Sequence, residues 1–204
     1  MTILPDLSLN ASAEAELPGY HGISITDVHL IVSPEDAAMA LSALRDTDVV
    51  GFDTESKPTF SKGEASTGPH LIQLAAGSKV YLFQVKPGID LKVARMILEA
   101  KHILKVGFGL ESDTERLKTR LGIESDNVLD LARVLPGSKA RKTIGAKAAV
   151  AHYFGKRMAK SKRTSTSNWA ASRLTERQML YAANDAQVAL YVYRMAFPGE
   201  SAKS

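Results

Sequence analysis

The sequence predicts an α/β protein in which a central mixed β-sheet is flanked by α-helices. Three observations predict it. Apolar runs of strand length alternate with amphipathic segments that begin and end at helix-capping residues. Three of the runs, residues 49–52, 71–75 and 80–85, are close enough in sequence to form an antiparallel meander, with the turn at 76–79. Helices then alternate with strands, an order typical of layered α/β folds.

The elements are expected in the following order. An apolar run at 28–32 predicts a strand, and Ser33 followed by Pro34 predicts the capped start of a helix. The run at 49–52 leads directly into Asp53-Thr54-Glu55. After the meander we expect a helix that is capped by Asp90 and ends near Ala100, followed by a strand at 103–106. A helix from Ser112 to Gly122, with Glu115 in a capping box, and a short strand at 128–129 come next. The last two elements are a helix at 143–154 stopped by Gly155 and a long helix at 175–195 that begins with a capping box of Thr175 and Gln178.

The composition bounds the domain organisation. At 204 residues with 45% hydrophobic residues, the chain fits one globular domain, placed at 23–197 between a flexible N-terminal lead-in at 1–22 and a C-terminal tail at 198–204. No apolar run is long enough to cross a bilayer and no signal-peptide pattern opens the chain, so we expect a cytoplasmic protein without a membrane partner. Because cysteine is absent, any metal site must use oxygen or histidine ligands.

The charge is mildly basic, with 26 Lys+Arg against 22 Asp+Glu and a net charge of +4. Basic residues concentrate between Lys139 and Arg173. This surplus fits a polyanionic partner such as nucleic acid, although a run of charge is also the ordinary composition of a solvated face.

Acidic residues that follow an apolar strand form the first part of a candidate site. Residues two apart in a strand share a face, so Asp53 and Glu55 project together. Crowded carboxylates are costly unless a cation compensates them or one stays protonated. The alternative is that the strand ends at Phe52 and both acids are solvated turn residues.

Two further segments carry candidate residues. Tyr181 and Asp185 lie four apart and therefore on one face of the last helix, while Asp113 lies in a first helical turn, where the macrodipole favours an acid in any case. Each is also compatible with an ordinary surface position. In combination, acids from separate elements supply the oxygen ligands that Mg²⁺ prefers, and two such ions roughly 4 Å apart are suited to in-line displacement at phosphorus.

Three motifs in a fixed order identify a family resemblance. They are Gly51-Phe52-Asp53-Thr54-Glu55, the segment 106–113 with the sequence VGFGLESD, and the segment 181–186 with the sequence YAANDA. The chain resembles the tyrosine-bearing (DEDDy) branch of the DEDD superfamily of 3′-5′ exonucleases. Segments 71–74, 80–83 and 167–169 also resemble exonuclease domains of the Werner and ribonuclease D types. The resemblance extends from Val28 to Phe197 and implies a ribonuclease H-like fold.

The resemblance also implies site roles and cofactors. Two ions, Mg²⁺ or Mn²⁺, are expected: Asp53, Glu55 and Asp185 would hold the first, and Asp53 with Asp113, directly or through water, the second. Tyr181 would hydrogen-bond the nucleophilic water, and Glu55 would help to orient it. Because a tyrosine with a pKa of about 10 is a poor base at neutral pH, orientation is the expected role.

The implied activity is release of nucleoside 5′-monophosphates from the 3′ end of single-stranded or 3′-recessed nucleic acid. DNA is favoured, because Lys105-Val106-Gly107 is closer to the Werner-type pattern and no helical nucleic-acid-binding domains of the ribonuclease D kind follow the nuclease segment. RNA 3′-end trimming remains an alternative. So do a non-nucleic-acid phosphoesterase and a catalytically silent nucleic-acid-binding scaffold, although the full set of four acids and the tyrosine argues against a scaffold. The recruiting protein and the oligomeric state stay open.

Basic residues ahead of the last helix are candidates for phosphate contact, with a mobile basic loop as the alternative: Lys156, Arg157, Lys160, Lys162 and Arg163. We assign Trp169 to packing, because aromatic side chains bury large areas. A loop with Phe60, Gly63 and Gly68 is expected near the mouth of the site.

Overall fold

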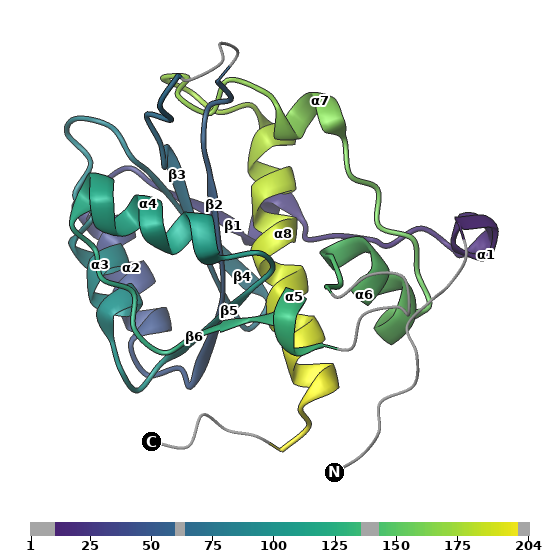
Figure 1. The fold of residues 1–204 in the computed structure, drawn as a ribbon. Coiled ribbons are helices and arrows are strands. Elements are labelled where there is room, and N and C mark those ends of the chain that lie inside the picture. Colours follow the sequence, from purple (N-terminus) through teal and green to yellow (C-terminus); the bar gives the residue numbers. More distant parts are fainter. Residues whose placement is uncertain (1–10, 60–63, 136–142, 200–204) are drawn as a thin grey trace.

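A mixed β-sheet lies at the centre of the molecule, between two layers of helices, in a computed structural model that describes residues 11–59, 64–135 and 143–199 (Figure 1). The sheet order is β1-β4-β3-β2-β5-β6. The strands are β1 Val28–Ile31, β2 Val49–Glu55, β3 Leu71–Ala76, β4 Lys79–Gln84, β5 Leu104–Gly107 and β6 Val128–Asp130. The neighbours β2, β3 and β4 pair antiparallel and the other neighbours pair parallel, which confirms the predicted meander and the mixed sheet.

Helices cover both faces of this sheet. They are α1 Ala11–Glu16, α2 Pro34–Leu44, α3 Lys92–Glu99, α4 Glu111–Leu121, α5 Leu131–Val134, α6 Ala146–Phe154, α7 Lys162–Ser165 and α8 Glu176–Ala196, with a 3₁₀ turn at Ile25–Asp27. One apolar core packs α2, α3 and α4 against the sheet, and the other packs α6 and α8 against the opposite face (Figure 1). The long helix α8 therefore lies directly across β2 and β3.

Two helix starts agree with the sequence because their caps are local. The Ser33 hydroxyl accepts the Asp36 N–H and the Asp36 carboxylate accepts the Ser33 N–H, which closes a capping box at α2. Thr175 and Gln178 close the predicted capping box at α8. Gly122 and Gly155 end α4 and α6 in the left-handed conformation, as predicted.

Two predicted caps are wrong. Helix α3 begins at Lys92 with Leu91 as N-cap, and Asp90 lies one residue outside, accepting the Lys92 N–H. The predicted capping box of Ser112 and Glu115 does not form, because α4 already begins at Glu111. Instead, the carboxylate of Asp130 at the end of β6 accepts the N–H groups of Gly109 and Leu110, at 2.8 and 3.2 Å. A distant residue thus supplies the acceptor that a local cap would provide.

Other details of the chain differ from the expected elements. Helix α6 begins at Ala146 rather than 143, and α1, α5 and α7 are short helices that the sequence did not predict. The domain boundaries stay a prediction, but the end of the expected lead-in bonds to the body of the domain. The Tyr20 N–H donates to the Arg157 carbonyl at 2.9 Å, and the Arg157 N–H donates to the Pro18 carbonyl at 2.8 Å.

No helix in the described part of the chain has the length and apolar character of a membrane span.

Candidate active site

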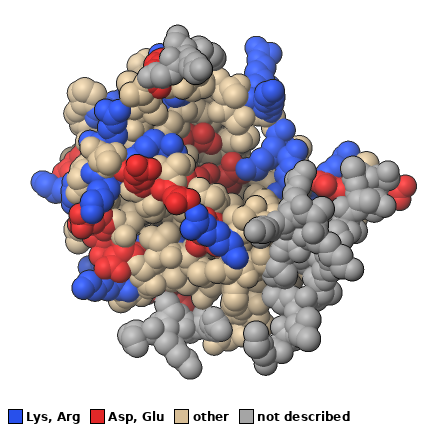
Figure 2. Space-filling view, viewed as in Figure 1, with Lys and Arg blue, Asp and Glu red and all other residues tan. Residues whose placement is uncertain are grey.

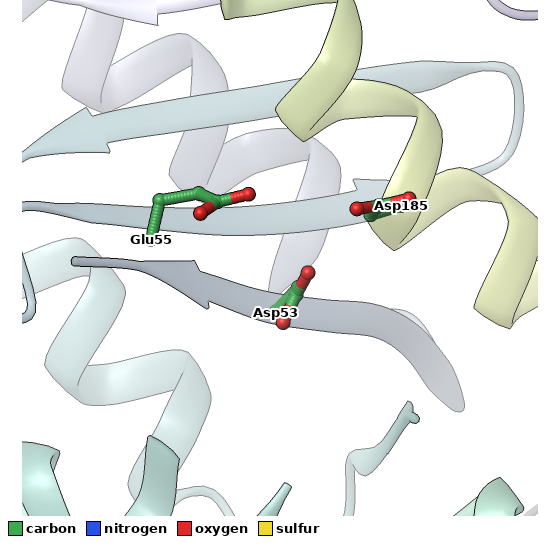
Figure 3. A group of neighbouring side chains, drawn as sticks. All are labelled: Asp53, Glu55 and Asp185. Carbon is green, nitrogen blue, oxygen red and sulfur yellow. The ribbon is translucent and has the colours of Figure 1, made fainter. Parts of the chain in front are cut away.

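Three carboxylates from β2 and α8 converge on one point. Asp53, Glu55 and Asp185 each place a carboxylate oxygen within 4.8 Å of the other two. The carboxylates point into a shared space between the strand and the helix (Figure 3). Strand β2 continues through both of its acids, which pair with Gln73 and Leu71 of β3, so the solvated-turn alternative is wrong.

A close approach between backbones brings the two elements together. A Cβ atom built on Gly51 would lie 2.0 Å from the Ala186 carbonyl oxygen, so only glycine lets α8 come this close to β2. Gly51 and Asp53 share the face of β2 that α8 covers. Because Ala186 follows Asp185, the contact that glycine permits also places the Asp185 carboxylate opposite the strand acids.

Asp113 lies beside this group rather than within it. Its buried carboxylate accepts a hydrogen bond from the Thr54 hydroxyl and another from Arg116 Nη2, at 3.1 Å for the latter. Its charge nevertheless contributes to raising the pKa of Asp53. The structure therefore groups three of the four predicted acids and holds the fourth next to them through Thr54.

Burial and mutual repulsion make this cluster unfavourable without a cation. Burial, followed by the charges of Asp185 and Asp113, holds the pKa of Asp53 well above its ordinary value. Burial and the Asp53 charge raise the pKa of Glu55 to about 9, and burial raises that of Asp185. Several carboxylate oxygens in a small space are the ligand set of a hard divalent ion.

Lys160 supplies the positive charge nearest to the cluster in the described structure. Its Nζ lies 2.8 Å from Asp185 Oδ1, as an ion pair, and 5.8 Å from the centre of the Tyr181 ring. Lys160 was predicted to contact phosphates, and it lies in the acidic site itself. Burial, together with the charges of Asp185 and Glu55, raises the pKa of Tyr181, so its hydroxyl stays protonated at neutral pH and can donate a hydrogen bond.

A pocket of about 230 Å³ opens beside these side chains and is lined by Tyr20, Gly22, Met158, Ala159, Lys160, Tyr181, Asn184 and Asp185. Figure 2 shows acidic side chains at the bottom of a hollow on this face. Tyr20 and Asn184 were missed by sequence reasoning. Asn184 adjoins Asp185 within the third motif and could have been singled out, whereas Tyr20 comes from a segment without any periodic signal.

The other predicted contacts are distributed around the site. Arg157 pairs through its backbone with Gly19, and Lys162 and Arg163 lie on α7 with exposed side chains, while Lys156 is half-buried. Trp169 is fully buried, as predicted, with its indole N–H donating to the Ser165 carbonyl and its ring 6.1 Å from that of Tyr181. Phe60 and Gly63 lie outside the described residues.

The metal-free protein is expected to lose stability as the pH rises. Because the pKa of Glu55 is raised from 4.5 to about 9, the folded state keeps a proton in this window that the unfolded chain releases. The loss of folding stability from Glu55 is absent below the pKa of its carboxyl in the unfolded chain and grows until the pH reaches the pKa in the folded state. Thermal unfolding in EDTA at about pH 5, 7 and 9 should give a Tm that falls by at least ~4 °C overall.

Glu55→Gln should flatten this dependence, and addition of Mg²⁺ should raise the Tm most at high pH. Glu115→Gln, which removes an exposed carboxyl on α4, serves as the control and should leave the slope as it is. A Tm that stays constant or rises over this window in EDTA would contradict the raised pKa.

Comparison with known proteins agrees with the geometry. Over 162 residues, or 78% of its length, the chain is 35% identical to the mouse bifunctional 3′-5′ exonuclease/ATP-dependent helicase WRN. The Aedes aegypti Nibbler EXO domain superposes with a TM-score of 0.70 at 26% identity, covering 86% of this chain and 90% of that domain. A Trypanosoma brucei RNase D in complex with RNA U12 shares the fold, with a TM-score of 0.71 at 20% identity, covering 94% of this chain and 66% of that protein.

The chain spans between 11% and 51% of the length of the curated relatives it matches. These relatives and solved structures place the mixed sheet and its helices in the ribonuclease H-like exonuclease fold. A family model described as 3′-5′ exonuclease matches residues 28–195, which include the strand acids, Asp113 and α8 up to Met195. The chain therefore belongs to the 3′-5′ exonuclease family.

Proposed function

We propose that this chain is a metal-dependent 3′-5′ exonuclease that hydrolyses the terminal phosphodiester bond of nucleic acid and releases nucleoside 5′-monophosphates. The observation that carries the proposal is the convergence of Asp53, Glu55 and Asp185 within 4.8 Å. Such a cluster has little structural value, since burial raises the pKa of each of its acids and repulsion adds to the rise for Asp53 and Glu55. The binding of divalent ions best explains why three carboxylates are held together despite this unfavourable burial and repulsion.

In this proposal, the acidic residues of the site bind the metal ions, and Tyr181 orients the attacking water. Asp53, Glu55 and Asp185 would hold the first ion, and Asp53 with Asp113 the second. Two bound Mg²⁺ or Mn²⁺ ions would supply a water of lowered pKa and stabilise the charge on the leaving oxygen. Lys160 forms an ion pair with Asp185 in this structure, and metal binding by the carboxylate would free the ammonium to contact phosphate.

Tyr181 orients the attacking water in this proposal, as in the tyrosine-bearing branch. Tyr181→Phe keeps the ring near Trp169 and removes only the hydroxyl. Because one well-placed hydrogen-bond donor contributes about 100-fold or more, we expect kcat to fall by about that factor with KM nearly unchanged. Single-turnover cleavage of a labelled oligonucleotide measures the effect.

Tyr191→Phe removes a hydroxyl farther along α8 and should be silent in the same assay. A wild-type kcat for Tyr181→Phe would show that the hydroxyl has no part in the mechanism. A change of the pH optimum, in place of a uniform fall in rate, would assign Tyr181 a role as general base rather than orienting group.

DNA is the substrate that we favour. The second motif of the sequence supports it, because it resembles the Werner-type pattern, and the chain is 35% identical to the mouse exonuclease/helicase WRN. The alternative is RNA, the ligand of the trypanosomal RNase D named above. Discrimination rests on contacts to the 2′-hydroxyl. Matched DNA and RNA oligonucleotides, single-stranded and 3′-recessed, should be degraded with kcat/KM higher for DNA, and a higher value for RNA would reverse the assignment.

A further inference from the structure

We propose that a second pocket, at the start of α8, binds the phosphate backbone of the strand being degraded, two to four nucleotides away from the scissile bond. The pocket has a volume of about 430 Å³. Three arginines from three segments line it: Arg163 of α7, Arg173 of the loop that follows, and Arg177 in the first turn of α8. The assignment to the degraded strand rests on the proposed function.

The arginines carry positive charge that no carboxylate among the described residues neutralises in an ion pair. Within the described residues, none of the three forms an ion pair, although arginines elsewhere do so: Arg45, Arg95, Arg116 and Arg133. Three guanidinium groups around one concavity repel one another, so the arrangement favours an anion with several acceptor oxygens. The planar guanidinium fork fits the oxygens of a phosphate group.

The pocket has a fixed framework. Arg177 Nη2 donates to the Ser161 hydroxyl at 2.7 Å, which ties the first turn of α8 to the N-cap of α7. Gln178 is buried, and its amide nitrogen donates to Ser167 Oγ at 3.0 Å and to the Asn168 carbonyl at 3.3 Å. These bonds hold the Arg177 side chain and the loop before α8 in place, which lowers the reorganisation that binding a ligand requires.

The pocket lies on a path that leads to the acidic site. Arg177, Tyr181 and Asp185 are spaced by four residues, so they follow one side of α8. At a rise of about 1.5 Å per residue, Arg177 lies roughly 12 Å along the helix from Asp185. A strand with a rise of about 3.4 Å per nucleotide when stacked, and more when extended, covers this span in two to four nucleotides. Figure 2 shows basic side chains on the α7 side of the acidic hollow.

Binding tests the pocket without any need for catalysis. The double variant Arg173→Gln/Arg177→Gln, built on Asp53→Asn, is titrated in EDTA with a fluorescent single-stranded DNA of about a dozen nucleotides over a range of salt concentrations. Loss of two phosphate contacts should weaken binding about tenfold or more and lower the salt slope by about 1.4. Arg45→Gln/Arg194→Gln removes the same charge from exposed positions elsewhere and should have a much smaller effect. Equal effects of the two double variants overturn the proposal.

A second measurement locates the contact. In a series of oligonucleotides, each carries one uncharged methylphosphonate linkage at a different distance from the 3′ end. The protein with wild-type arginines should bind less tightly to the oligonucleotides whose uncharged linkage is the second, third or fourth from the 3′ end. The affinity of the double variant should not change when these linkages are modified. A position-independent effect in both proteins overturns the proposal.

Hydrolysis of a dinucleotide separates this proposal from the proposed function, because a dinucleotide is too short to reach the arginine pocket. With Asp53 intact, the arginine variant should cleave it at the wild-type rate. A wild-type protein that cleaves neither the dinucleotide nor a longer oligonucleotide refutes the exonuclease function, while the two binding measurements still decide the pocket.

Discussion

Asp53→Asn should lower kcat by at least about 1,000-fold while the protein remains folded. Asp53 belongs to the carboxylate group, together with Glu55 on its own strand and Asp185 on α8. The amide has nearly the same shape as the carboxylate but lacks the charge that binds a hard cation. Because the change also removes repulsion in a buried cluster, the metal-free variant should melt at a higher temperature than the metal-free wild type.

Calorimetric titration with Mn²⁺, alongside an oligonucleotide cleavage assay, measures both consequences. The wild type should bind the ion and cleave, and the variant should do neither. Asp46→Asn, which changes an exposed aspartate, is the control and should match the wild type in both assays. Cleavage by Asp53→Asn at more than about a tenth of the wild-type rate would assign the carboxylate a minor role, well below the effect of a catalytic ligand.

Gly51→Ala should cost about 3 kcal/mol or more of folding stability and most of the activity. The new methyl group would lie 2.0 Å from the Ala186 carbonyl oxygen and 3.1 Å from the Ala75 Cβ. The first neighbour is backbone of the longest helix, so relief requires α8 to move away from β2. That movement would carry Asp185 away from Asp53, and added metal should therefore not restore the rate.

Thermal unfolding should show a Tm lower by at least ~6 °C for Gly51→Ala. Gly19→Ala is the matched control, because a Cβ at Gly19 meets no atom within 4 Å. A Gly51→Ala protein with the wild-type Tm and rate would show that α8 does not depend on this contact for its position.

Local signals in the sequence were sufficient for much of the fold. The alternation that puts Asp53 and Glu55 on one face depends only on strand geometry, and the capping boxes at Ser33 and Thr175 close over three residues. These features need no knowledge of distant parts of the chain. The family resemblance then selected Asp185 to join the strand acids, and the geometry brings it there.

The features that the sequence did not predict depend on contacts between distant segments. Asp130 supplies acceptors ahead of α4 from the end of β6, a contact that no local pattern encodes. The position of Lys160 against Asp185 follows from how the chain before α8 folds back onto it. Arg173 is the last residue of the basic stretch and Arg177 lies beyond it in α8, and only the fold brings them together with Arg163 around one pocket.

The central claim is that this acidic site removes nucleotides one at a time from the 3′ end, and its most direct test is a time course on one oligonucleotide labelled either at the 5′ end or at the 3′ end. With Mg²⁺ or Mn²⁺, the 5′ label should shorten in single-nucleotide steps and the 3′ label should appear at once in a mononucleotide. EDTA should stop both. Internal fragments, or a 5′ label that is released first, would contradict the claim.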